Sequence, residues 1–401
     1  MTKPLDGPSE GQNKTTSALD AMIDLDHPIK AAASRWATEQ LDSGDMIDRD
    51  QNCEFWPDGW QRAADHGVLG LMIDPGFGGS GHGVVSALLF FEGLGYGCSD
   101  AGLVFALACQ VWTTQPIIER FASDELKQRY LPKLVSGESL GAFTITETDS
   151  GSDSFAMATT YKPVDGNGYT ISGEKAYVTM APEADVFIVF ATKDPALGQW
   201  GVTAFLVDAK TPGLTVNPNR PKMGLRTTPF ADVSFDGCIV PASQRIGPEG
   251  SGAAIFSSAM QAERAFVLAG QIGGMQRQLD DAVSYARDRK QFGQAISSFQ
   301  AVSHRLAEMK LRHEISRLLL YKAAALAEAG KPSMEAAALA KIQASESAIA
   351  SSVDTILTTG AHGYVTENEI ERRLRDVAGG VVYGGTSDIQ RNIVARMLGL
   401  S

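Results

Sequence analysis

The sequence of 401 residues has little of what marks several protein classes. Its four cysteines (Cys53, Cys98, Cys109 and Cys238) lie far apart and form no Cys-x-x-Cys pair. This spacing argues against a disulfide framework and a zinc site, and it fits a protein of the reducing cytoplasm. The six histidines form no His-x-x-x-His pair, so we expect no metal centre.

Basic charge and long apolar runs are also scarce. The net charge is −12, and a nucleic-acid-binding protein needs a basic footprint. No run approaches the ~18 uninterrupted apolar residues of a membrane-spanning helix. Residues 1–19 lack the apolar centre of a secretory signal. We therefore expect a loose tail over 1–19 and neither nucleic acid nor membrane as a partner.

What the sequence does contain is three segments of different hydrophobic period. Residues 20–138 repeat apolar positions at helical spacing. Residues 139–248 repeat them at a spacing of two, with a hairpin turn at 165–168. Residues 249–401 are helical again, and 254–292 are predicted to form one helix. The pattern predicts an α+β fold with an N-terminal helical domain, a middle antiparallel β domain and a C-terminal four-helix bundle.

Two short motifs imitate known sites. Residues 76–81 match Gly-x-Gly-x-x-Gly, but Pro75 precedes them and no βαβ unit follows. Residues 137–141 match Gly-x-Ser-x-Gly, but a helical pattern precedes the serine, and Gly137 suits a helix C-cap. We therefore predict loops in both places rather than a dinucleotide site or a nucleophile elbow.

Four other segments are each ordinary when taken alone. Residues 143–153 read as a strand that breaks into a polar loop, and 175–179 end another strand. Residues 287–293 end a long helix with arginines, which either offset its dipole or hold a pyrophosphate. Residues 383–391 open the last helix, and the glycine pair there allows a close backbone approach.

In this order, the four segments resemble the acyl-CoA dehydrogenase family. The family pattern includes TEPGAGSD, a W-I-T strand, R-x-Q-F-G and Y-E-G-T-S, and this chain has TETDSGSD, YVT, RKQFG and YGGTS. The resemblance extends over nearly the whole chain after the tail. It implies a flavoprotein that binds FAD and forms a homodimer or homotetramer. It also implies that the protein dehydrogenates an acyl thioester and passes the electrons to an acceptor whose identity stays open.

The resemblance also implies which residues meet the FAD. The expected contacts are Phe143, Thr144, Ile145, Thr146, Ser152, Tyr177, Val178, Thr179, Arg289, Gln291, Phe292, Gln300, Leu357, Gly360, Ala361, Thr386 and Asp388. Thr179 is expected at the flavin N5 edge. Arg289, Gln291 and Gln300 are expected at the pyrophosphate and adenosine end, across a subunit interface. Leu357 and Ala361 stand where the family usually has Gln and Gly.

The chain departs from the family at the catalytic base. The usual base is the Glu of Y-E-G-T, and Gly384 stands there. Gly384 keeps a backbone N–H that can donate to a thioester oxygen. Glu263 is the predicted base, because an apolar helix face desolvates its carboxylate and raises its pKa. The other interpretation is a structural ion pair with Arg264 or another arginine. The long-chain and isovaleryl branches of the family carry their base at the position of Glu263.

The acyl group is less defined by the sequence. The expected substrate contacts are Ser152, Gln261, Arg264, Tyr383 and Gly385. The bulk of Tyr383 argues against an isovaleryl thioester. Residues 184–188, 243–250 and 309–312 are similar to dehydrogenases of secondary metabolism that act on prolyl carrier proteins. We therefore favour a carrier-bound thioester over a CoA ester. A flavin oxidase or oxygenase of the same fold and an interaction module without flavin stay open.

Overall fold

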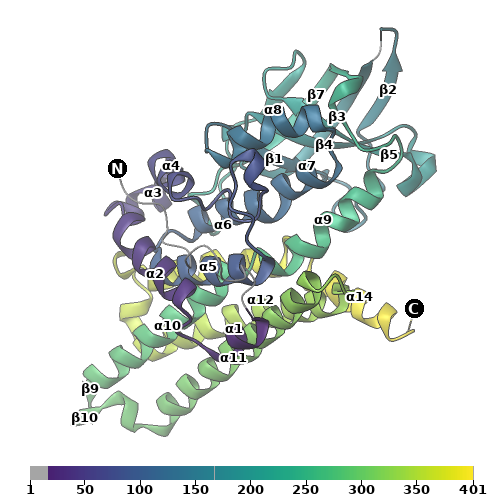
Figure 1. The fold of residues 1–401 in the computed structure, drawn as a ribbon. Coiled ribbons are helices and arrows are strands. Elements are labelled where there is room, and N and C mark those ends of the chain that lie inside the picture. Colours follow the sequence, from purple (N-terminus) through teal and green to yellow (C-terminus); the bar gives the residue numbers. More distant parts are fainter. Residues whose placement is uncertain (1–16, 167, 401) are drawn as a thin grey trace.

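A β-sheet lies at one end of the molecule and long helices extend from it to the other end (Figure 1). The computed structural model describes residues 17–166 and 168–400. Most of the predicted tail therefore lies outside the described residues, and residues 18 and 19 belong to helix α1 (Ala18–Ile23). The domain limits 20–138, 139–248 and 249–401 stay predictions. No described helix or strand crosses the limits at 138 and 248.

The N-terminal region is helical, as predicted. It contains α2 (Pro28–Gln40), α3 (Met46–Asn52), α4 (Pro57–Asp65), α5 (Val84–Gly97), α6 (Ala101–Cys109), α7 (Gln115–Phe121) and α8 (Asp124–Val135). A π-helical turn, Gln110–Thr114, joins α6 to α7. The run Ala101–Phe121 has the length and mean hydropathy of a membrane span although polar residues interrupt it, and 78% of its most apolar window is buried within the protein. It is therefore the kind of helix that forms a protein core.

Both imitated motifs lie in loops, as predicted. Pro75–Phe77 form a short 3₁₀ turn between α4 and α5, with no strand before it. Gly137 follows the end of α8 with φ +77°, the left-handed conformation that a helix C-terminus commonly requires of glycine. Neither segment therefore has the strand that its motif needs.

The middle region forms one sheet. Its strands are β1 (Gly141–Thr144), β2 (Thr160–Val164), β3 (Gly168–Thr179), β4 (Val186–Thr192), β5 (Val202–Asp208), β6 (Leu214–Val216), β7 (Phe230–Pro241) and β8 (Arg245–Ile246). Their order is β6-β7-β3-β2-β4-β5-β8, with β1 beside β4. The β2–β3 hairpin confirms the predicted turn, of which residue 167 lies outside the described part. The sheet is mixed rather than fully antiparallel, because β1 and β2 both run parallel to β4.

The C-terminal region is helical and differs from the prediction in one element. It contains α9 (Gly252–Phe266), α10 (Ala269–Asp288), α11 (Gln300–Glu328), α12 (Met334–Thr359), α13 (Ile370–Ala378) and α14 (Ser387–Met397), with a small hairpin, β9 (Lys290–Gln291) and β10 (Gln294–Ala295), after α10. The single helix predicted over 254–292 is wrong. The chain breaks at Val267–Leu268, where the Leu268 N–H bonds to Ala265 O at 3.1 Å. The break lets α9 pack on β5 while α10 packs on α5 and α12.

The N-terminal and C-terminal helices share one hydrophobic core. Helix α5 lies directly against α10, and glycines make this approach possible: a Cβ on Gly95 would lie 1.8 Å from Gly270 O, and one on Gly273 would lie 1.8 Å from Glu92 O. Larger residues at these positions would push the two helices apart. The close contact fixes the position of α10 and thereby of the Val267–Leu268 break.

A buried ion pair organises the polar loop that follows β1. Lys175 Nζ lies 2.8 Å from Glu147 Oε1, and both side chains are buried. Glu147 also accepts the backbone N–H groups of Ala158 (2.6 Å) and Thr159 (3.0 Å). Burial lowers the pKa of Lys175 to about 8, and Glu147 opposes that shift. Both partners are therefore charged at pH 7 and together hold residues 146–159 in place.

Removing the cation should destabilise this loop strongly. We expect Lys175→Met to lower the free energy of unfolding by about 3–5 kcal/mol, because it leaves a buried carboxylate without a counterion. Lys133→Met is the control, since Lys133 and Glu138 form an exposed pair at 3.1 Å and such pairs contribute under about 1 kcal/mol. Denaturant unfolding measures both variants. Equal losses would contradict the role assigned to the buried pair.

Candidate active site

Glu263 lies near the end of α9, one turn before the break at Val267. Its Oε2 atom is enclosed and has no hydrogen-bond partner among the described residues. Burial raises the pKa of Glu263 to about 7, and the Thr113 hydroxyl and the Arg264 guanidinium oppose this shift only in part. A carboxylate in this state exchanges a proton readily near neutral pH, as a general base requires.

The alternative of a structural ion pair with Arg264 is not supported. No ion pair joins Glu263 and Arg264 in the part of the chain that the structure describes, and Arg264 Nε is itself buried without a partner. Burial lowers the pKa of Arg264, and Glu263 opposes this. The two charges therefore influence each other without forming a direct contact, and the carboxylate stays available.

The π-helical turn lies against α9 and was not predicted from the sequence. It carries Thr113, whose hydroxyl lies close enough to Glu263 to oppose the rise in its pKa, although its buried Oγ1 forms no hydrogen bond of normal geometry within the described chain. Cys109 ends α6 just before this turn, and burial, followed by the charge of Glu263, raises the pKa of its thiol well above the usual value. A π-turn is rare and frequent at functional sites. In this protein the π-helical turn places Thr113 and Cys109 close to Glu263.

Gly384 lies beside α9. A Cβ on Gly384 would lie 3.7 Å from the Cα of Arg264. The Gly384 carbonyl accepts a hydrogen bond from Gln390 Nε2 at 3.0 Å. Its N–H has no acceptor among the described residues. The loop therefore offers a free backbone donor close to the helix of Glu263, as stabilisation of a developing oxyanion requires.

The loop that contains Gly384 is held from both sides. Thr386 is the N-cap of α14 and accepts the Ile389 N–H at 3.2 Å. Lys341, buried in α12, donates to Gly380 O at the start of the loop. Gly384 and Gly385 have φ values of +64° and +84°, which other residues adopt only with strain. The glycine pair therefore gives the turn its shape, and Asp388 projects into solvent from the first turn of α14.

The predicted contacts at the end of β1 are only partly available to a ligand. Thr144 and Ile145 are buried in the sheet, and the Thr144 hydroxyl donates to Ile188 O at 2.9 Å. Phe143 stacks on Phe256 of α9, with ring centroids 6.3 Å apart. Thr146 is half-buried and Ser152 is exposed. The loop thus presents two hydroxyls, while the Phe143 ring packs against the helix of Glu263.

The end of β3 lies next to this loop, because the Ala176 N–H donates to Thr146 O at 2.8 Å. Tyr177 has φ +60° and is exposed, Val178 is buried, and Thr179 is half-buried. The register of β3 against β7 shifts between Lys175 and Val178. The strand therefore presents Thr179 and the Tyr177 ring at the edge of the sheet.

The remaining predicted contacts lie elsewhere. Arg289, Gln291, Phe292 and Gln300 are exposed around the β9–β10 hairpin, which forms the end of the helical region remote from the sheet (Figure 1). Phe292 is 93% exposed, and Arg289 forms no ion pair with any described residue. Leu357, Gly360 and Ala361 are exposed at the end of α12. The Tyr285 hydroxyl ties that end to α10 by donating to Thr359 O at 3.3 Å.

One chain therefore does not bring all the predicted cofactor contacts to one ligand. The sheet edge offers half-exposed hydroxyls and an aromatic face, which suit the flat isoalloxazine ring of a flavin. The hairpin offers an unpaired guanidinium and two amides, which suit a pyrophosphate. The donor chemistry fits FAD if two copies of the chain bind it together. Gln261 is exposed on α9, and Arg264 and Tyr383 are half-buried. Of these three residues, Arg264 and Tyr383 lie beside Gly384.

Comparisons with known proteins show the family of the chain. Three family models match the chain: acyl-CoA dehydrogenase, N-terminal domain (residues 26–138), middle domain (142–238) and C-terminal domain (250–399). An L-prolyl-[peptidyl-carrier protein] dehydrogenase of Pseudomonas fluorescens is 42% identical over 85% of this chain and 90% of that protein.

Two solved structures are also similar. The prolyl acyl carrier protein oxidase AnaB has a TM-score of 0.91 and 40% identity over 93% of this chain and 98% of that one. PigA with FAD and proline has a TM-score of 0.91 and 37% identity over 97% of this chain and 100% of that one. In view of these matches, the chain belongs to the acyl-CoA dehydrogenase family.

Proposed function

We propose that the protein is an FAD-dependent dehydrogenase that introduces an α,β double bond into an acyl thioester, and that a carrier protein rather than CoA holds that thioester. The enclosed Glu263 carboxylate, which has a pKa of about 7 and lies near the free Gly384 N–H, is the observation that carries this proposal. The names of the relatives support the carrier, because two of them act on prolyl carrier proteins.

The chemistry divides between the residues and the cofactor. An α-proton beside a thioester is weakly acidic, so its removal needs a base and a stabilised enolate oxygen. Glu263 takes the α-proton. The Gly384 N–H donates to the thioester oxygen as negative charge grows there. FAD supplies the acceptor for the β-hydride. When FAD is bound, Thr179, Ser152 and the Phe143 loop would hold its flavin end, and Phe143 is itself supported by Phe256 of α9.

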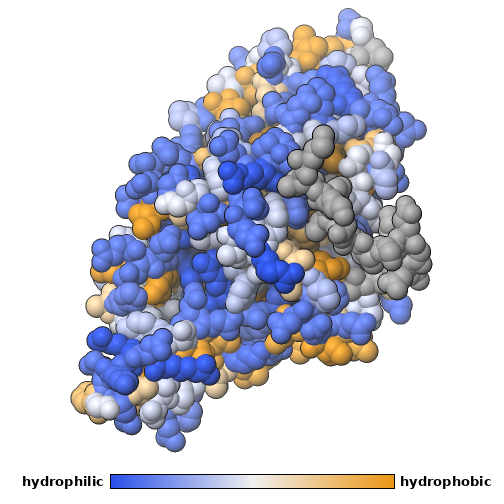
Figure 2. All heavy atoms as spheres, turned by 60° about the vertical axis from the view of Figure 1, so that its left-hand side comes forward, coloured by the Kyte–Doolittle hydropathy of each residue, from blue (hydrophilic) through white to orange (hydrophobic). Residues whose placement is uncertain are grey.

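The protein also forms a homo-oligomer in this proposal, because the hairpin of one copy completes the FAD site of another. Leu311, Ile315 and Leu318 form an exposed apolar stripe on α11, and Val353 and Leu357 extend it on α12. Figure 2 shows apolar patches along the lower edge of the helical region. A second copy that covers this stripe would remove it from water. A cytoplasmic location stays a proposal that rests on the separated cysteines.

A panel of thioesters tests the reaction and the carrier together. We expect a prolyl- or acyl-loaded carrier protein to bleach the flavin within seconds, with an unsaturated thioester as the product by mass spectrometry. The matching CoA esters should bleach it slowly, since the CoA nucleotide contributes little binding here. Efficient turnover of the CoA esters would overturn the carrier assignment. Bleaching without an unsaturated product would favour the oxidase or oxygenase alternative.

The shared cofactor site gives a separate prediction. Arg289→Ala should weaken FAD retention at least about tenfold, because one charge-assisted contact contributes roughly 1.5–3 kcal/mol, while the fold stays intact. Arg35→Ala is the matched control, since Arg35 is also exposed and lies on α2. Equilibrium dialysis measures FAD retention, and light scattering measures the oligomer. Unchanged affinity in Arg289→Ala, or a monomer that keeps stoichiometric FAD, would contradict the shared site.

A further inference from the structure

Two enclosed polar atoms lie on elements that pack against each other at the proposed base. Glu263 is half-buried as a residue, but its Oε2 atom is enclosed, and so is the Oγ1 atom of Thr113 in the π-helical turn. Neither atom has a hydrogen-bond partner among the described residues. A carboxylate oxygen accepts hydrogen bonds and a threonine hydroxyl donates one. The two atoms are therefore complementary, and buried polar atoms without a partner are rare enough to require an explanation.

Aromatic packing fixes the π-helical turn at the level of Glu263. The ring of Trp112, the neighbour of Thr113 in the chain, lies 5.3 Å from the ring of Phe266 between centroids. Both rings are fully buried. Phe266 follows Glu263 by three residues on α9, and residues at this spacing are neighbours on a helix surface. The contact therefore holds the turn that carries Thr113 alongside the last turn of α9.

Neighbouring residues show which threonine of the turn faces the base. Cys109 precedes Thr113 by four residues, a spacing that places two side chains on one face of a helix. The charge of Glu263 acts on the Cys109 thiol, and the Thr113 hydroxyl acts on the pKa of Glu263. Thr114 packs on the sheet instead, because a Cβ on Gly141 of β1 would lie 2.5 Å from Thr114 Cγ2. Thr113 is therefore the threonine on the side of Glu263.

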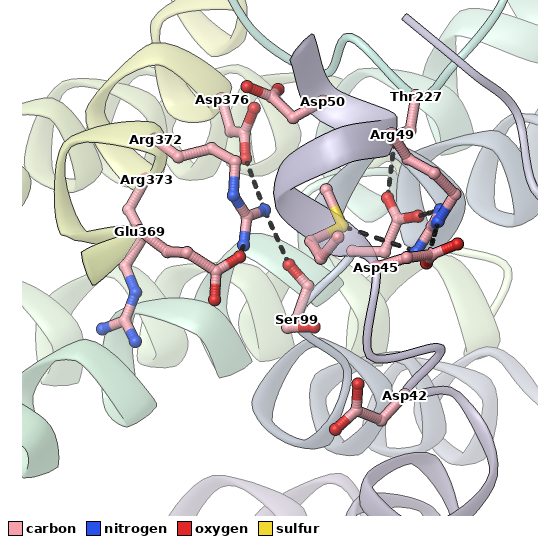
Figure 3. Close-up of polar contacts among 12 residues, drawn as sticks. Asp42, Asp45, Arg49, Asp50, Ser99, Thr227, Glu369, Arg372, Arg373 and Asp376 are labelled. Carbon is pink, nitrogen blue, oxygen red and sulfur yellow. Dashed lines mark hydrogen bonds and ion pairs between the residues drawn. The ribbon is translucent and has the colours of Figure 1, made fainter. Parts of the chain in front are cut away.

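Elsewhere the protein completes the same kind of contact. Thr227 is buried, and its hydroxyl donates to Asp100 Oδ1 at 2.6 Å. Asp100 also forms an ion pair with Arg49 at 2.5 Å, and Figure 3 shows Arg49 and Thr227 in this cluster. Asp100 is therefore a carboxylate that is held in its charged form by a cation. Glu263 contacts no cation among the described residues, as suits a group that gains and loses a proton in each turnover.

We propose that the Thr113 hydroxyl donates a hydrogen bond to Oε2 of Glu263 when a thioester is bound. Thr113 is thereby a positioning residue for the base: it leaves the other carboxylate oxygen for the α-proton and stabilises the ionised carboxylate. Hydrogen bonds at catalytic groups are often poorly aligned without substrate and tighten in the complex. This inference rests on the proposed dehydrogenation and adds a residue to its machinery.

The other ionisable groups near Glu263 do not replace Thr113 in this role. Arg264 is the charged group of the described chain that acts on Glu263, and it forms no ion pair with it. Burial raises the pKa of the Cys109 thiol and of the Tyr383 phenol, so both are neutral at pH 7. Burial, to which the charge of Arg264 adds, lowers the pKa of Lys341 on α12 to about 8. Glu263 is therefore the group of this set that titrates near pH 7, and Lys341 follows at higher pH.

The test measures flavin reduction by a loaded carrier protein as a function of pH, using the holoenzyme. Thr113→Val keeps the shape of the side chain and removes the donor. We expect the pH midpoint of the second-order rate constant to rise by about 1–2 pH units, because a hydrogen bond to a charged group stabilises the ionised carboxylate. Thr113→Ser keeps the hydroxyl and should keep the midpoint. Thr114→Val is the matched control, since Thr114 is buried in the same turn but packs on β1, and its midpoint should not move.

A Thr113→Val protein whose rate falls equally at every pH, with an unchanged midpoint, would overturn the inference, because lost packing alone has that effect. A midpoint that rises as far in Thr114→Val would overturn it too. Thr113→Ala replaces Thr113→Val if that variant does not fold.

Infrared titration of the Glu263 carboxyl gives the midpoint without turnover. The holoenzyme is titrated with an unreactive thioether of the carrier arm bound, and Glu263→Gln serves as the blank. If no thioester is oxidised, the proposed function is wrong, but a raised infrared midpoint in Thr113→Val still supports the hydrogen bond. An infrared midpoint that stays at the wild-type value overturns the inference whether or not the enzyme turns over.

Discussion

The structure depends most on the cost of enclosing the Glu263 carboxylate, whose Oε2 atom has no hydrogen-bond partner among the described residues. A buried charge of this kind is unfavourable unless its ionisation is suppressed, and the raised pKa is the consequence. The surrounding elements maintain this state. Helix α9 ends one turn later, the π-helical turn contributes Thr113, and the glycine loop approaches from α14. Each element is held by contacts that lie outside the site itself.

Those contacts come from different parts of the chain. Lys341 of α12 holds the start of the glycine loop, and the Glu147–Lys175 pair holds the loop after β1. Glycines let α5 and α10 approach closely, which fixes the break before α10. The site is therefore a junction between the sheet and the two helical regions. In the proposed function a second copy completes its cofactor end, because Arg289 and Gln291 lie at the β9–β10 hairpin, remote from the sheet (Figure 1).

The sequence predicted most of the fold because its periodicity changes sharply at two places, and it predicted the base because an acidic residue on an apolar stripe needs an explanation. It did not predict the break at Val267, since no proline or glycine lies there and the break follows from different packing partners of α9 and α10. Thr113 was missed as well, because its place beside Glu263 depends on a π-helical turn that spacing along the chain does not reveal.

The rate of flavin reduction as a function of pH tests the central claim that Glu263 is the base. The wild-type second-order rate constant for flavin reduction should fall about tenfold per pH unit below 7, because protonation removes the base. It should level off above pH 7, because the pKa of Glu263 is about 7. Glu263→Gln keeps the size of the side chain and should retain FAD, yet its rate should drop by at least ~10²–10⁴-fold at every pH. A Glu263→Gln protein that reduces its flavin at near wild-type speed would contradict the account.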